Sequence, residues 1–83
     1  MNPIEELINL SEHGTFAVVN TANKALKYQK HLNHNEISLD EYEELMQDLV
    51  SEKNLARFAD DLETQAKIEQ AVNALIMIAK AAS

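Results

Sequence analysis

Apolar side chains recur along this chain three or four residues apart, the spacing of one face of an α-helix. The first such stretch predicts a helix over residues 3–12. Asn2 and Pro3 stand at its start, as an N-cap and a first helical residue commonly do. Its shared face is apolar: Ile4, Leu7 and Ile8. A second stretch predicts a helix over residues 15–32, with small or branched inward residues: Val18, Val19, Ala22, Ala25 and Leu26.

The single glycine of the chain, Gly14, stands between these two stretches. Glycine is a common helix terminator, and Thr15 after it is a suitable N-cap for the next helix. The apolar positions nevertheless keep one phase across the glycine, so one continuous helix is the alternative. We expect a break or kink at Gly14.

The start of a third helix is the most clearly marked point in the sequence. Ser38 and Glu41 have the spacing of a capping box, and acidic residues fill the first turns, where the helix dipole favours negative charge. The preceding segment, residues 33–37, has the composition of a loop. We therefore predict a helix over residues 38–51. Its buried stripe is Leu39, Tyr42, Met46, Leu49 and Val50.

The helical pattern continues beyond this point but changes sides. At about 100° per residue, Leu55 lies on the opposite side of a continuous helix from Met46, so one straight helix cannot bury both against one core. We therefore predict a turn at Ser51–Asn54 and a last helix over residues 54–82. The alternatives are an unbroken helix through this point and a later start at Asp60.

The last helix is apolar around more of its circumference than a surface helix needs, and residues 70–83 carry one charge, Lys80. Without cysteine the chain has no disulfide to add stability, which leaves oligomerisation as the usual addition for a small domain. We predict one all-α domain over residues 1–83. Its architecture is a three- to four-helix antiparallel bundle with a long C-terminal helix, completed by formation of a homodimer or higher homo-oligomer. The predicted oligomer interface is Leu62, Ile68, Val72, Leu75, Ile76 and Ala79.

The net charge of −7 is concentrated in the middle of the chain, where residues 38–69 hold ten acidic and three basic residues. This distribution argues against nucleic acid as a partner, because phosphate backbones bind basic surfaces. The chain begins without a basic segment followed by an apolar run, and its apolar tail is shorter than the ~20 residues that cross a bilayer. We expect a cytoplasmic protein without a membrane partner.

Two groups of side chains are candidates for metal chemistry. His31 and His34 lie at the end of a predicted helix, where imidazoles commonly meet free carbonyls, so we favour that role over a metal site. Carboxylates form the second group. Glu41 and Glu44 match the E-x-x-E half of the motif of small all-α nucleotide pyrophosphatases of the MazG type, but the E-x-x-D half is missing.

This partial resemblance implies, as an alternative, a metal-dependent all-α nucleotide hydrolase. Its carboxylates would be Glu41 and Glu44 together with the nearest later acids, Asp60 and Asp61. A catalytic cysteine is excluded because the chain has none, and a single glycine excludes a glycine-rich phosphate loop. We therefore predict no enzymatic activity and no cofactor.

The favoured interpretation is a small, acidic, non-enzymatic interaction or assembly module that self-associates and has a possible protein partner. A further alternative is an acidic decoy that occupies the DNA-binding surface of another protein, as the acidic middle segment suggests. The one basic cluster is Lys24, Lys27 and Lys30. Since the next helix is expected to pack antiparallel, we predict that Lys27 and Lys30 face its acidic residues, Glu41 and Glu44.

Overall fold

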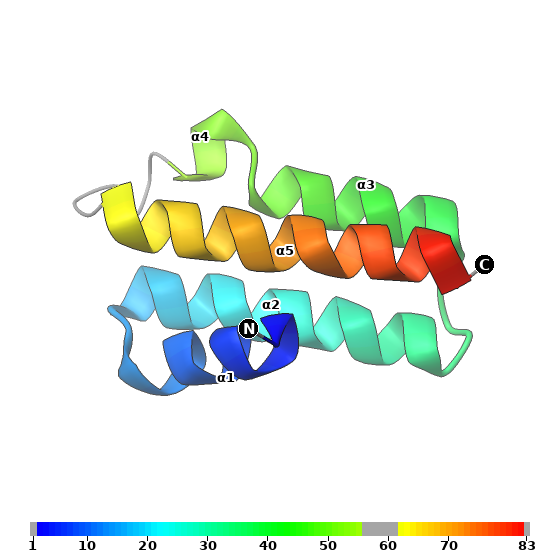
Figure 1. The fold of residues 1–83 in the computed structure, drawn as a ribbon, viewed down its shortest axis with the longest axis horizontal. Helices are drawn as coiled ribbons and strands as arrows, with labels where there is room; N and C mark the ends of the chain where they lie inside the picture. Colours follow the sequence, from blue (N-terminus) through cyan, green and yellow to red (C-terminus); the bar gives the residue numbers. More distant parts are fainter. Residues whose placement is uncertain (1, 56–61, 83) are drawn as a thin grey trace.

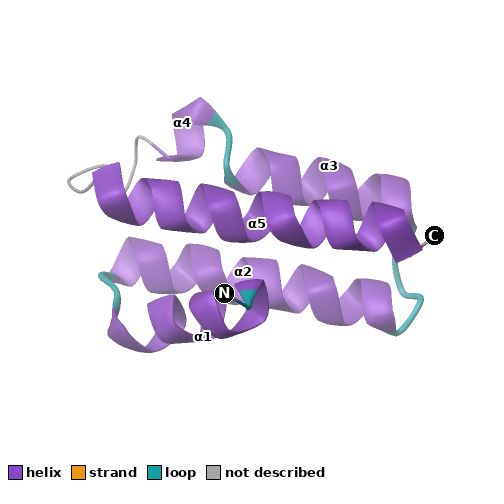
Figure 2. Ribbon diagram, in the orientation of Figure 1, coloured by secondary structure: helices purple, strands orange, loops and turns teal. Residues whose placement is uncertain are grey.

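The computed structural model describes residues 2–55 and 62–82, and all regular structure in these ranges is helical. The helices are α1 (Pro3–His13), α2 (Phe16–Asn33), α3 (Leu39–Leu49), α4 (Glu52–Leu55) and α5 (Leu62–Ala82). The predicted all-α class is confirmed. Figures 1 and 2 show α2 and α5 running in one direction, with α1 and α3 running in the other. α1 and α3 each contact both α2 and α5.

The helix ends form where the sequence signals place them. The Asn2 side chain accepts the backbone N–H of the residue two positions on, at 2.9 Å. Ser38 and Glu41 form a complete capping box: the Glu41 N–H donates to Ser38 Oγ at 3.1 Å, and the Ser38 N–H donates to Glu41 Oε1 at 3.2 Å. The expected break at Gly14 is confirmed, because α1 ends before it and α2 begins after it.

The boundary between the third and last helices differs in detail from the prediction. Residues 52–55, which the sequence divided between a turn and the last helix, form the short α4. The Asn54 side-chain amide donates to the backbone oxygen of Asp48 at 2.6 Å, which fastens α4 to the end of α3. The last helix, predicted over residues 54–82, is described as α5 from Leu62 to Ala82. The alternative start at Asp60 lies outside the described residues.

The core lies where α1, α2, α3 and α5 converge. Leu7 from α1, Tyr42 and Met46 from α3, and Ile68 and Val72 from α5 are completely buried. Small buried residues on α2 and α5 let the helix backbones approach closely: Ala22, Ala25 and Ala71. Since interiors pack as densely as organic crystals, cutting one of the large core side chains back to alanine costs about 2–5 kcal/mol.

Four of the six residues predicted to form an oligomer interface lie in this core, at most 6% exposed: Ile68, Val72, Leu75 and Ile76. The prediction assumed that one chain has too few helices to cover the last one. In the structure α1 and α3 both contact α5, and the buried residues of α2 complete the core. These four residues are therefore almost completely covered by the helices of their own chain. Of the other two, Ala79 is half-buried and Leu62 is 78% exposed.

Gly14 is packed too closely for a side chain. A β-carbon at this position would lie 2.6 Å from Val18 Cγ1 and 2.8 Å from the backbone oxygen of Leu10. Because backbone atoms of a helix cannot move aside cheaply, we expect Gly14→Ala to lower the free energy of unfolding by about 1–3 kcal/mol in urea denaturation. Asn23→Ala, at an exposed position of α2, is the control and should cause no loss, since alanine favours helix. Unchanged stability of Gly14→Ala would contradict this tight α1–α2 corner.

Tyr42 links α3 to α2, because its buried hydroxyl donates to Gln29 Oε1. Burial raises the pKa of Tyr42 to about 12, since the phenolate would lose its hydration. The resulting contribution of Tyr42 to the free energy of unfolding is complete below pH 10, the ordinary pKa of a tyrosine. It is lost as the pH rises towards 12. In a Tyr28→Phe variant phenolate absorbance reports Tyr42 alone, and we expect a midpoint near 12. A midpoint near 10 in the folded protein would contradict this burial.

Candidate interaction surface

α1 is too short to cover the whole length of its neighbours. It has 11 residues, against 18 in α2 and 21 in α5. At 1.5 Å per residue these helices are about 16, 27 and 32 Å long. Figure 1 shows α1 beside the N-terminal halves of α2 and α5. Within the described ranges, the C-terminal halves of α2 and α5 therefore have no covering helix on this side.

A groove of about 450 Å³ lies between these C-terminal halves. Its lining comes from α2, the α2–α3 loop, the start of α3 and α5, and none of the lining residues carries a charge: Gln29, Leu32, Asn33, Asn35, Leu39, Leu75, Ile78, Ala79 and Ala82. The Gln29 amide donates to Asn33 Oδ1 at 3.1 Å and also accepts the hydroxyl of Tyr42. This wall of the groove is therefore held in place by side-chain hydrogen bonds to the core.

Two large apolar side chains protrude from the C-terminal half of α5, and one of them, Ile78, lines the groove. Ile78 is 56% exposed and Met77 is 71% exposed. The next turn presents Ala81 and Ala82, also exposed. Single exposed apolar residues are ordinary, but adjacent ones next to an uncharged hollow form a patch of the kind that interaction sites use. We name Met77, Ile78, Ala81, Ala82 and the groove the α5 surface.

The α5 surface overlaps the predicted interface in two residues, because Leu75 and Ala79 line its groove. Its protruding residues, Met77 and Ile78, were not among the predicted ones. Their position on the helix carried a signal: at about 100° per residue both lie more than 90° from Val72, which is completely buried. The apolar pattern placed Ile78 at one edge of the main apolar face and Met77 away from that face, and the structure shows that no described element covers either side chain.

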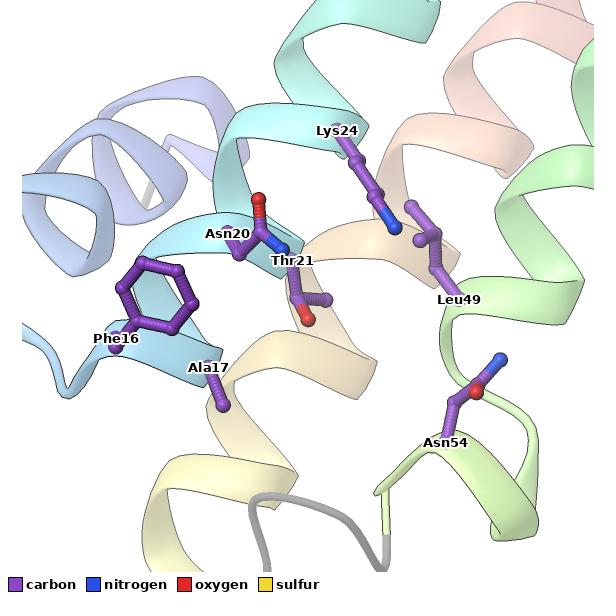
Figure 3. A pocket seen from close by; sticks show the side chains of 7 residues that line it. All are labelled: Phe16, Ala17, Asn20, Thr21, Lys24, Leu49 and Asn54. Atoms are coloured by element: carbon purple, nitrogen blue, oxygen red, sulfur yellow. The ribbon is translucent and has the colours of Figure 1, made fainter.

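A second hollow, of about 220 Å³, lies between the N-terminal half of α2 and the end of α3. Figure 3 shows the Lys24 side chain extending across it towards Leu49, with the ring of Phe16 at its far end. Phe16 is 86% exposed. The hollow is half the size of the groove on α5 and contains a charged amine, so it is the poorer site for an apolar partner.

The acidic residues of α3 form a third hollow, of about 460 Å³, in which Glu41, Glu44 and Asp48 surround the partly exposed Leu45. Glu41 is already engaged in the capping box. The other two carboxylates of the alternative hydrolase site, residues 60 and 61, lie outside the described residues. In residues 2–55 and 62–82, no group of three or more histidine or carboxylate side chains is placed to hold a metal ion.

The lysines of α2 do not pair with α3 as predicted. Neither Lys27 nor Lys30 has a carboxylate of α3 within 4.0 Å in the described part of the chain. Successive helical residues turn by about 100°, so these two positions rotate away from the side on which Lys24 approaches α3. The ion pair that reaches α3 comes instead from α5: Lys80 Nζ lies 3.0 Å from the Glu43 carboxylate. An exposed pair of this kind contributes at most about 1 kcal/mol.

Two histidines converge on one carboxylate at the α2–α3 loop, which borders the groove. His31 Nδ1 hydrogen-bonds with Glu36 Oε2, and His34 Nδ1 lies 3.6 Å from Glu36 Oε1. The hydrogen bond with His31 is the main reason why the pKa of Glu36 lies below 4.5, with smaller contributions from the charges of His31, His34 and Lys30. Asn35, between His34 and Glu36 in the sequence, adopts a left-handed backbone conformation with φ of 58°.

This contact predicts how the loop responds to acid. Because its pKa is lowered, Glu36 contributes stability that is present above pH 4.5 and is lost as the pH falls through its pKa in the folded state. We expect an NMR titration of the Glu36 carboxyl to have a midpoint below 4.5, and His31→Ala to raise it. His13→Ala, on α1, should leave the midpoint unchanged. A wild-type midpoint at or above 4.5 would show that the histidines do not hold this carboxylate.

Comparison with protein-family models, with curated proteins and with solved structures finds no match to this chain. In the described ranges, no helix combines the length and the apolar character needed to cross a bilayer. Function is therefore inferred from the surface itself, where the groove of the α5 surface has a lining without a charged side chain.

Proposed function

We propose that this chain is a non-enzymatic helical interaction module that self-associates, as a homodimer or larger homo-oligomer, through the α5 surface. The observation that carries the proposal is the uncharged groove with the exposed Ile78 in its lining, together with the exposed Met77 about 100° further around α5. Burial of such apolar area stabilises a complex by about 25 cal/mol per Å², so covering both side chains favours binding of a partner.

The charge distribution supports self-association at this surface. Each copy carries a net charge of −7, so most approaches of two copies are repulsive. Residues 70–83 contain one charged side chain, Lys80, and it is paired with Glu43 of the same chain. At the C-terminal half of α5 two copies can therefore approach with little charge repulsion.

The lengths of the helices support the same proposal. α1 leaves the C-terminal halves of α2 and α5 uncovered on its side, and a partner helix in the groove would occupy the place that a longer α1 would fill. A helix of about 7 residues, or two turns, spans the ~10.5 Å that α1 lacks relative to α2. Association would thus complete the packing of the bundle, in the manner of a helix docked into an apolar groove.

Sedimentation velocity of the parent chain and of Ile78→Glu tests this proposal. We expect the parent to sediment as a dimer or larger, and the variant at the 9.3 kDa mass of one chain with unchanged helical circular dichroism. Burial of an unpaired carboxylate at the interface should weaken association at least tenfold. Gln70→Glu, eight residues earlier on the same helix, adds the same charge outside the α5 surface. This variant should keep the parent's mass.

Two results would contradict the proposal. One is a folded parent chain that stays at 9.3 kDa up to about 1 mM, since association would then be weaker than about 4 kcal/mol. The other is equal loss of association in Ile78→Glu and Gln70→Glu, which would trace the effect to net charge and not to the α5 surface.

A further inference from the structure

The α5 surface carries both a protrusion and a hollow. Ile78 lines the groove and is also 56% exposed, so it stands at the edge of the space that it helps to form. A two-fold contact places one patch against its own copy, and it therefore requires a patch that is complementary to itself. A hollow with a free apolar side chain at its edge meets that requirement, because each copy offers the side chain that the other can receive.

The small residues of α5 allow the two helices to approach closely. Ala74 and Ala82 lie one turn before and one turn after Ile78, on nearly the same side of the helix. Alanines at these positions leave room beside the isoleucine for the backbone of another helix. The polar part of the lining consists of uncharged amides, such as those of Gln29 and Asn33, so no unpaired charge has to be buried.

The charges of α5 determine the direction of the second helix. Its exposed carboxylates, Glu63 and Glu69, both lie in its N-terminal half, whereas its C-terminal half has none. Glu69 is about 180° from Ile78 around the helix and faces away from a partner on that side, whereas Glu63 is about 60° from Ile78. Parallel packing would therefore bring Glu63 of one copy towards Glu63 of the other. Antiparallel packing that crosses near Ile78 points the two N-terminal halves in opposite directions and keeps these carboxylates apart. Antiparallel helix dipoles also attract each other.

We infer that the occupant of the groove is a second copy of this chain, related by a two-fold axis that crosses α5 near Ile78, with the two α5 helices antiparallel and Ile78 of each copy in the groove of the other. This inference rests on the proposed self-association and adds the identity, symmetry and direction of the partner helix.

Spin labels at two positions of α5 test the arrangement. The chain has no cysteine, so Ala81→Cys and Ala66→Cys each give one labelling site, and both positions are exposed. For an antiparallel crossing near residue 78, the axial separation between equivalent sites is about 9 Å at residue 81 and about 36 Å at residue 66. We expect the distance measured by pulsed dipolar spectroscopy to be about 20–25 Å longer at residue 66 than at residue 81.

The outcomes separate this inference from the proposed function. Equal distances at the two sites would show parallel helices and overturn the inference, while self-association would stand. Long distances at both sites in a sample that sediments as a dimer would place the contact elsewhere and overturn both. A monomeric mass for unlabelled protein would overturn the proposed function itself. If a label at residue 81 prevents association, Gln70→Cys with Ala66→Cys replaces the pair, and the distance should be about 12 Å longer at residue 66.

Discussion

The length of α1 determines which surface of this chain remains open. The Asn2 cap starts the helix at Pro3, and Gly14, which has no space for a β-carbon, ends it after 11 residues. α1 therefore covers the first half of α2 and of α5 and leaves the second half to other contacts (Figure 1). α3 covers α5 from the other side, with Tyr42 and Met46 in the core. What remains is one uncharged groove with Ile78 at its edge, and the proposed association follows from that geometry.

The wall of the groove is connected to the core by side-chain hydrogen bonds. Gln29 in its wall accepts the hydroxyl of Tyr42, the largest completely buried side chain, and donates to Asn33. The neighbouring loop is held by the contacts of Glu36 with His31 and His34. A wall fixed in this way loses little conformational freedom when a partner binds, which favours affinity. The hollow beside Lys24 is smaller and contains a charged amine.

The sequence predicted the helices because their ends carry specific chemistry: a cap at Asn2, a glycine at position 14 and a capping box at Ser38. It also predicted the change of direction after Leu49, from the phase of the apolar residues alone. It did not predict which side of α5 is exposed. Periodicity gives the relative phase of side chains, and in the last turns nearly every position is apolar or alanine, so burial depends on how far α1 and α3 extend. The lysine pairs across α2 and α3 failed for a related reason, since sequence spacing does not give the rotation of one helix against another.

The central claim is that Ile78 of one copy lies in the groove of the other. An isotope-filtered NOE experiment on a mixture of labelled and unlabelled chains measures this contact directly. We predict intermolecular cross-peaks between the methyl groups of Ile78 and those of Leu39 or Leu32, which line the groove. A dimeric sample in which Ile78 shows cross-peaks only within its own chain would contradict this contact.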